Sequence, residues 1–219
     1  NLFSLLILLT MVFTVRAQSD DLSKEKVILV IHGGAGTILK KNMTAEKEAA
    51  YEQKLMQALE AGYKVIKNGG ASVEAVRSAI NIMEDSPLFN AGKGSVYTNA
   101  ETQEMDASIM TGEDKAAGAV GGVSIIKNPI NAAIAVMNES EHVLLTGDGA
   151  EEFAKKCGVE IVDTSYFKSD VRMRQLKRVK DKEKTVLDHD GDQGNNNHSE
   201  DEFNIDSIED KKFGTVGAV

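Results

Sequence analysis

The sequence predicts an α/β protein, because short strand-like runs alternate with amphipathic helical patterns and glycine-rich turns separate them. The first run, Lys26–Ile31, is aliphatic after its lysine and leads directly into the turn His32–Gly36, which is typical of a fully buried strand that delivers a glycine loop. The 219 residues contain 19 Gly and only 2 Pro, so tight backbone passages are frequent. A hydrophobic share of 42% supports one domain with a buried core.

Two helices are predicted after this strand. The first, Thr44–Lys67, begins with a threonine suited to cap it and stops at the glycine pair Gly69-Gly70. The second begins at Ser72, repeats apolar residues at helical spacing and ends before Pro87.

From Gly92 onward the pattern changes to shorter elements. Strands are predicted at Ser95–Thr98, Met105–Met110, Gly118–Ile126 and His142–Leu145, and helices at Pro129–Met137 and Glu151–Cys157, the latter entered through Gly147-Asp148-Gly149. The alternation in Met105–Met110 places Asp106 and Ser108 together on one face, so that strand presents a polar side.

The N-terminal residues 1–17 are predicted to be a secretory signal. Leu2–Val15 is apolar, and Val15 and Ala17 are small residues at the spacing of a cleavage site after Ala17. A membrane anchor is the alternative, but the run is shorter than the roughly 20 residues that cross a bilayer. The absence of an initiator Met indicates that the signal is truncated at its start. We therefore expect a secreted or periplasmic protein.

Charge and motif content exclude several classes of function. A net charge of −9 argues against nucleic acid as a partner, since that binding depends on Lys and Arg. Cys157 is the only cysteine, so neither an internal disulfide nor a thiolate zinc site is possible. The G-x-S-x-G pentapeptide of the ester hydrolases does not occur.

The composition shifts after Ser165 from mixed to strongly charged and polar. The chain is rich in Lys and Arg up to Lys184, and 188–210 contains almost no apolar residues. Such a stretch buries too little surface to fold, so 166–214 is predicted to be a flexible linker that proteases cut easily. Hydrophobic character returns at Phe213–Val219, which reads as the start of a strand.

Two features have both a chemical and a structural interpretation. The turn after Ile31 exposes main-chain N–H groups that can bind an anion or an oxyanion, but such turns are common without any function. In Gly214-Thr215, cleavage before Thr215 would free an α-amine, with a pKa near 8, to act as base for the threonine hydroxyl. A lone Gly-Thr is usually only a strand start, so its context must decide.

Six segments supply that context. They are Ile31–Gly36, Pro87–Ser95, Glu104–Met110, Gly118–Val123, Thr146–Glu151 and Gly214–Val219. In order and spacing they resemble the plant-type L-asparaginases and isoaspartyl peptidases, a family of N-terminal-nucleophile hydrolases, and they cover nearly everything from Lys26 on.

The resemblance implies an αββα sandwich, incomplete in this chain, made as one precursor that cuts itself before Thr215. The α subunit would comprise the core 26–165 and the linker 166–214, and residues 215–219 would begin the β subunit. The freed Thr215 would attack the side-chain amide of asparagine or the isopeptide carbonyl of a β-aspartyl dipeptide through an acyl-enzyme. The family usually pairs αβ units into an (αβ)2 dimer.

The resemblance also implies the site residues. Gly33 and Gly34 would border the active site, and Asn90 would lie beside the nucleophile. A structural sodium ion, with no organic cofactor, would be held by the main-chain oxygens of Met83, Glu84, Ser86, Phe89, Ala91 and Lys93. The family's remaining substrate-binding and oxyanion residues would lie beyond Val219, so we expect the 219-residue chain to be inactive by itself.

Two other interpretations remain open at the level of sequence. The related glycosylasparaginases cleave the link between sugar and asparagine and also use an N-terminal threonine. A noncatalytic secreted scaffold fragment, in which the glycine loops only shape the fold, is the alternative from a different class.

Overall fold

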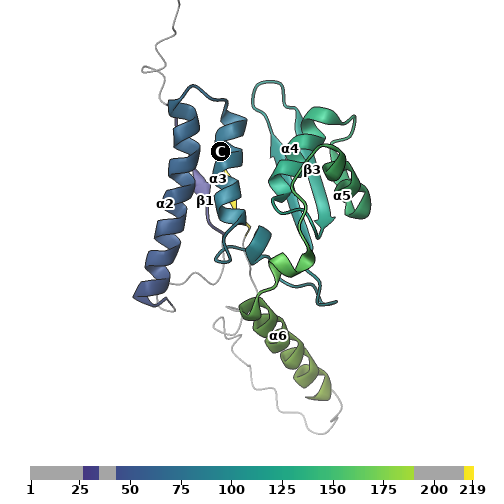
Figure 1. Cartoon of the computed structure of the whole chain (residues 1–219). Coiled ribbons are helices and arrows are strands. Elements are labelled where there is room, and N and C mark those ends of the chain that lie inside the picture. Colours follow the sequence, from purple (N-terminus) through teal and green to yellow (C-terminus); the bar gives the residue numbers. More distant parts are fainter. Residues whose placement is uncertain (1–26, 35–42, 190–214) are drawn as a thin grey trace, which may run out of the picture.

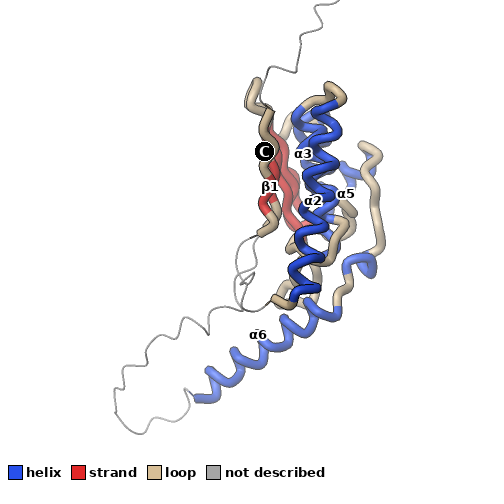
Figure 2. The backbone as a smooth tube through the Cα atoms, turned by 90° about the vertical axis from the view of Figure 1, so that its left-hand side faces the viewer, coloured by secondary structure: helices blue, strands red, loops and turns tan. Residues whose placement is uncertain are grey.

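The computed structural model describes residues 27–34, 43–189 and 215–219, which form a mixed α/β fold. Strand β1 (Ile31–His32) pairs antiparallel with β5 (Gly217–Ala218). A second sheet has the order β2 (Met105–Met110), β3 (Ala117–Val123), β4 (Leu144–Thr146); β2 and β3 are antiparallel, whereas β3 and β4 are parallel. The strands form one layer, and helices α2, α3 and α5 lie on one side of it (Figure 2).

Helices α2 (Ala45–Lys67) and α3 (Ser72–Glu84) confirm the predicted helical pair and pack side by side (Figure 1). The Thr44 hydroxyl accepts a hydrogen bond from Lys47 N at 3.2 Å, as expected of a cap. The helices approach closely because Gly62 has no side chain: a Cβ there would lie 2.9 Å from Ala75 O.

Helix α4 (Pro129–Glu139), predicted to begin at its proline, joins the two hydrophobic clusters of the fold. Ala132 and Val136 pack in the cluster between the second sheet and α5. Ile130 and Ile134 pack in the cluster formed with α2 and α3. The beginning of α4 therefore lies where both halves of the core meet.

The prediction of a fully buried strand at Lys26–Ile31 is wrong. Ile28 is 76% exposed, and Val27 and Val30 are also exposed, while Leu29 and Ile31 are half-buried. Within the described residues β1 has only β5 as a strand neighbour, and only one of its faces packs on α2. Leu29 and Ile31 point to that face because strand side chains alternate.

The strand predicted at Ser95–Thr98 is also wrong, because side chains occupy its main-chain groups. Val96 N donates to Oδ1 of Asn90 at 3.0 Å, and Nε2 of Gln103 donates to Ser95 O at 2.8 Å. These groups are then not available for a strand ladder. The segment follows the short 3₁₀ turn η2 (Gly92–Gly94) without regular structure.

Helix α5 (Gly147–Lys156) begins at Gly147, so the predicted glycine entry belongs to the helix itself. It follows directly on β4. Its Glu151 is buried and its Oε1 accepts hydrogen bonds from Ser124 N, at 2.7 Å, and from Ile125 N, at 3.2 Å. These bonds attach α5 to the chain that leaves β3.

The segment predicted as a linker from residue 166 contains ordered structure. The 3₁₀ turn η3 (Thr164–Phe167) ends in Phe167, which is 0% exposed, and α6 (Asp170–His189) follows. A bias toward Lys, Arg, Gln, Leu and Met favours a helix. Helix α6 has no fully buried side chain at 170–181 and extends away from the rest of the fold (Figure 1). Composition alone therefore led to a wrong prediction for 166–189, and the rest of the predicted linker, 190–214, lies outside the described residues.

The predicted signal at residues 1–17 likewise lies outside the described residues. In the described ranges, no helix combines the length and the apolar character that crossing a membrane requires.

Candidate active site

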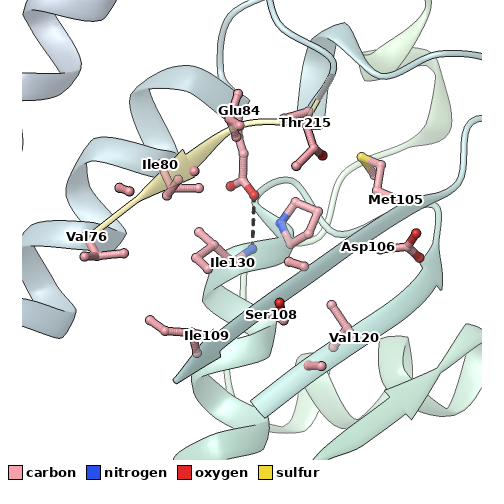
Figure 3. Close-up of a pocket in the computed structure, with 18 of the residues that line it drawn as sticks. Val76, Ile80, Glu84, Met105, Asp106, Ser108, Ile109, Val120, Ile130 and Thr215 are labelled. Carbon is pink, nitrogen blue, oxygen red and sulfur yellow. Dashed lines mark hydrogen bonds between the residues drawn. The ribbon is translucent and has the colours of Figure 1, made fainter. Parts of the chain in front are cut away.

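A cleft of about 1030 Å³ lies between α3, the segment 90–96, the second sheet and the chain that enters β5. Its polar lining residues include Glu84, Asn90, Asp106, Ser108, Thr146 and Thr215. Figure 3 shows Thr215 and Glu84 on one side, across from Asp106 and Ser108 of β2. The polar face predicted for β2 is thus confirmed, and it forms one wall of the cleft.

Thr215 is exposed at the edge of this cleft, two residues before β5. β5 is held by its pairing of Gly217 with His32, and by two hydrogen bonds between Val30 and Val219 at 2.7 and 2.9 Å. Thr215 is therefore the first described residue of a segment that β1 holds in place. Gly214, predicted to be the other side of a cleavage site, lies outside the described residues.

Asn90 lies in the same cleft and is tied to its own loop. Its Oδ1 accepts the hydrogen bond from Val96 N at 3.0 Å. Because the carbonyl end of the amide is bonded to the main chain, its NH2 group is the end that can bind a ligand. The fold thus brings together two predicted site residues, Asn90 and Thr215, that are far apart in the sequence.

Gly33 and Gly34 do not line the cleft. A Cβ at Gly33 would lie 3.1 Å from Cδ2 of Leu55 and 3.3 Å from Cε1 of Phe89, so a side chain at this position would point into the core. Gly34 has a φ of 108°, which favours glycine. Continuing the β1–β5 register by two residues would bring Gly34 level with Thr215.

The segment 83–95, predicted to hold sodium, is wound tightly on itself. A Cβ at Gly92 would lie 2.3 Å from Glu84 O, and one at Gly94 would lie 2.1 Å from Phe89 O, so these two oxygens face the inside of the turn. Met83 O accepts main-chain hydrogen bonds from Asp85 N and, at 3.1 Å, from Ser86 N, and Ala91 O accepts one from Gly94 N at 3.0 Å. Main-chain oxygens such as those of Glu84 and Phe89 are the ligand type that a hard monovalent cation prefers.

The side chain of Glu84 is a feature that the sequence analysis missed. It is 3% exposed, and its Oε1 accepts a hydrogen bond from Ile130 N, in the first turn of α4, at 3.1 Å (Figure 3). Its Oε2 is buried and bonds to no other group in the described part of the chain. Burial raises the pKa of this carboxyl to about 8, against the opposing effect of the Ile130 amide.

The sequence did contain a signal for Glu84. It follows Val76 and Ile80 at a spacing of four residues, so it lies on the apolar stripe of α3 rather than on its solvent face. A carboxyl on a buried stripe must be paired, protonated or functional.

Replacing Glu84 by glutamine is expected to flatten the pH dependence of stability. Between its ordinary pKa of 4.5 and about 8, the unfolded chain releases the Glu84 proton while the folded chain keeps it. The free energy of unfolding therefore falls as pH rises across this range, by up to about 1.4 kcal/mol per pH unit. Urea unfolding of the complete protein at pH 5 and pH 7.5 measures the difference.

The matched control for this measurement is Glu60→Gln, at an exposed position of α2. Glu60→Gln should leave the slope of the free energy of unfolding against pH as it is in the native protein. If Glu84→Gln also keeps the native slope, Glu84 ionises normally in the folded state.

Fold and cleft together describe an α/β protein with a concave surface on which polar groups converge, the kind of surface at which small molecules commonly bind. Residues 25–219 match the family model described as asparaginase. The chain belongs to this family.

Relatives with curated names agree with the family match. A Dictyostelium discoideum protein provisionally named an isoaspartyl peptidase/L-asparaginase is 48% identical over 213 residues, which cover 89% of this chain and 60% of that protein. The isoaspartyl peptidase of Escherichia coli is 41% identical over 194 residues, covering 89% of this chain and 56% of its own length. The plant-type L-asparaginase of Pyrococcus abyssi is 42% identical over 156 residues, which cover 71% of this chain and 48% of that protein. The chain thus spans about half to three-fifths of the length of these relatives.

Proposed function

We propose that the protein containing this chain hydrolyses the side-chain amide of L-asparagine and β-aspartyl (isoaspartyl) dipeptides, with Thr215 as its nucleophile. The observation that carries the proposal is the position of Thr215, at the edge of the cleft that Asn90 also lines and at the start of a segment that β1 holds. The names of the relatives support the substrate class.

The nucleophile is released by self-cleavage. Oγ of Thr215 attacks the carbonyl carbon of Gly214, the peptide C–N bond breaks, and the acyl group moves from nitrogen to oxygen as an ester. Water hydrolyses the ester, which leaves a carboxylate on Gly214 and a free α-amine and hydroxyl on Thr215. A strand anchored two residues downstream supports this step, because it limits the positions that the hydroxyl can take.

In turnover the free α-amine accepts the proton of the Thr215 hydroxyl as the oxygen attacks the substrate carbonyl. Ammonia leaves from asparagine, or an amino acid leaves from a β-aspartyl dipeptide, and an acyl-enzyme ester remains. Water then releases aspartate. The NH2 group of Asn90 is a donor suited to orient the attacking or attacked oxygen.

The finer architecture is part of the same proposal. The strand layer with helices on one side would be half of an αββα sandwich, and the β subunit that begins at Thr215 would supply the rest (Figure 2). The exposed apolar residues Val27, Ile28 and Val30 just before β1, and Leu144 of β4, support this assembly, because a second strand layer would cover them. We further propose an (αβ)2 dimer, exported by the signal at residues 1–17 to the periplasm or the exterior.

A sodium ion held by main-chain oxygens of the 83–93 segment is the proposed structural ion. Its chemistry would be that of a hard cation that fixes a loop, with no part in bond cleavage. The inward-facing oxygens of Glu84 and Phe89 support this role. A fixed loop in turn holds Asn90, whose neighbours Phe89 and Ala91 belong to the proposed ligand set.

An assay of the complete protein on matched substrates tests the activity. We expect ammonia from L-asparagine and free amino acid from a β-aspartyl dipeptide, whereas an α-aspartyl dipeptide, with the carbonyl displaced by one carbon, should be resistant. Hydrolysis of an N-glycosylated asparagine and of no other substrate would favour the glycosylasparaginase alternative. If none of these substrates is hydrolysed, the noncatalytic scaffold is favoured.

A further inference from the structure

Arg172 of α6, within the segment predicted as a linker, contacts the loop that carries Asn90. Its Nε donates a hydrogen bond to Gly94 O at 2.8 Å, and its Nη1 donates to Oε1 of Gln175 at 3.1 Å. The guanidinium is half-buried and burial lowers its pKa, yet an arginine stays charged at any physiological pH. Hydrogen bonds from a charged donor are roughly twice as strong as neutral ones, so this contact can hold a loop.

Two hydrogen bonds tie the short segment around Gly94 to Asn90 and its neighbour. Gly94 N donates to Ala91 O at 3.0 Å, which closes the turn η2. Two residues after Gly94, Val96 N donates to Oδ1 of Asn90 at 3.0 Å. The turn is tightly wound, because the position of a Cβ at Gly94 would lie only 2.1 Å from Phe89 O. A shift of the Gly94 carbonyl would therefore be transmitted to the Asn90 amide.

Two further contacts of α6 or η3, one with this loop and one with the turn that follows it, are weaker. The ammonium of Lys93 lies 5.0 Å from the centroid of the Tyr166 ring, and Nζ of Lys180 lies 2.9 Å from Oε1 of Glu101. Exposed ion pairs contribute little to stability, because water screens them and long side chains lose entropy. The charged bond of Arg172 to the main chain is thus the contact best able to fix the position of the loop.

We propose that Arg172 is a positioning residue for the hydrolytic site: through Gly94 it holds Asn90 in place beside Thr215. The inference rests on the proposed function and adds to it a role for α6, the helix that precedes the cleavage site. Because α6 lies upstream of Gly214, its contact with Gly94 is present both in the precursor and after the cut. Arg172 should therefore affect self-cleavage and turnover alike.

The test uses the complete protein with Arg172→Met, which keeps much of the apolar stem and removes the donors. We expect the rate of self-cleavage and kcat to fall about 10- to 100-fold, since a displacement of about 1 Å in a site has effects of this size. KM for a β-aspartyl dipeptide should change little, because substrate binding is not the step affected. Arg174→Met, with the same change of charge at an exposed position of α6, should keep native rates.

A double-mutant cycle separates positioning from a general loss of stability. If Arg172 acts through Asn90, the variant that combines Arg172→Met with Asn90→Asp should be no slower than Asn90→Asp alone. Rates are measured well below the unfolding midpoint of each variant, and Arg172→Gln replaces the methionine variant in the cycle if that protein is insoluble.

Three results would overturn the inference. The first is native rates in Arg172→Met, and the second is an equal loss in Arg174→Met. The third is a double variant whose rate is reduced by the product of the two factors found in the single variants. A native protein that neither cuts itself nor hydrolyses asparagine would instead overturn the proposed function, and the role of Arg172 with it.

Discussion

Replacing Thr215 by alanine will leave the complete protein as one uncut chain that hydrolyses neither asparagine nor β-aspartyl dipeptides. Alanine keeps the strand segment that β1 holds through Gly217, but it has no hydroxyl to attack the Gly214 carbonyl or a substrate. Intact-mass analysis should find two fragments in the native protein, divided between Gly214 and Thr215, and a single chain in the variant.

The matched control is Thr215→Ser, which keeps a hydroxyl and loses only a methyl group. It should still be cut, at a reduced rate, and should retain some activity. If Thr215→Ala is cut at the same bond as fast as the native chain, another group performs the cleavage and Thr215 loses its proposed role.

The second large effect is expected from Asn90→Asp, in which an oxygen replaces the amide nitrogen. The other oxygen can still accept the bond from Val96 N, so the loop should remain folded. The variant loses the NH2 donor in the cleft and gains a negative charge near the attacking oxygen. We expect kcat to fall about 100- to 1000-fold, the range seen when a donor to a developing charge is removed.

The control for this prediction is Asn99→Asp, which makes the same chemical change at an exposed position a few residues away. It should have native kcat, KM and thermal midpoint. Steady-state kinetics of both variants decide the matter: native kcat in Asn90→Asp would mean that the Asn90 amide does not take part in the reaction.

Local patterns in the sequence predicted most of the elements that build the cleft. The helical pair α2 and α3, strand β2 with its polar face, and helix α4 opening at Pro129 all lie close to where the sequence placed them. Each of these depends on signals within a few residues, such as a cap, a glycine stop or an alternation of side chains, and such signals act in the chain wherever it packs.

Predictions that depended on distant neighbours were less successful. Lys26–Ile31 reads as a buried strand, yet its burial depends on which layers cover it, and Ile28 is largely exposed. Ser95–Thr98 reads as a strand, but the side chains of Asn90 and Gln103 take its main-chain groups. For 170–189, charge suggested a linker, whereas the same residue types, Lys, Arg, Gln, Leu and Met, have high helix propensity and form α6.

The sequence by itself determined the family, most of the elements around the cleft and the candidate nucleophile, because these follow from residue types at fixed spacings. Only the tertiary structure decided which side chains meet. It placed Asn90 in the cleft of Thr215, buried the Glu84 carboxyl at the start of α4, and set Arg172 against Gly94. Contacts between segments so far apart in the chain depend on packing of the whole core. The stripe of α3 indicated that Glu84 would be buried, but no local pattern indicated which groups these three side chains would meet.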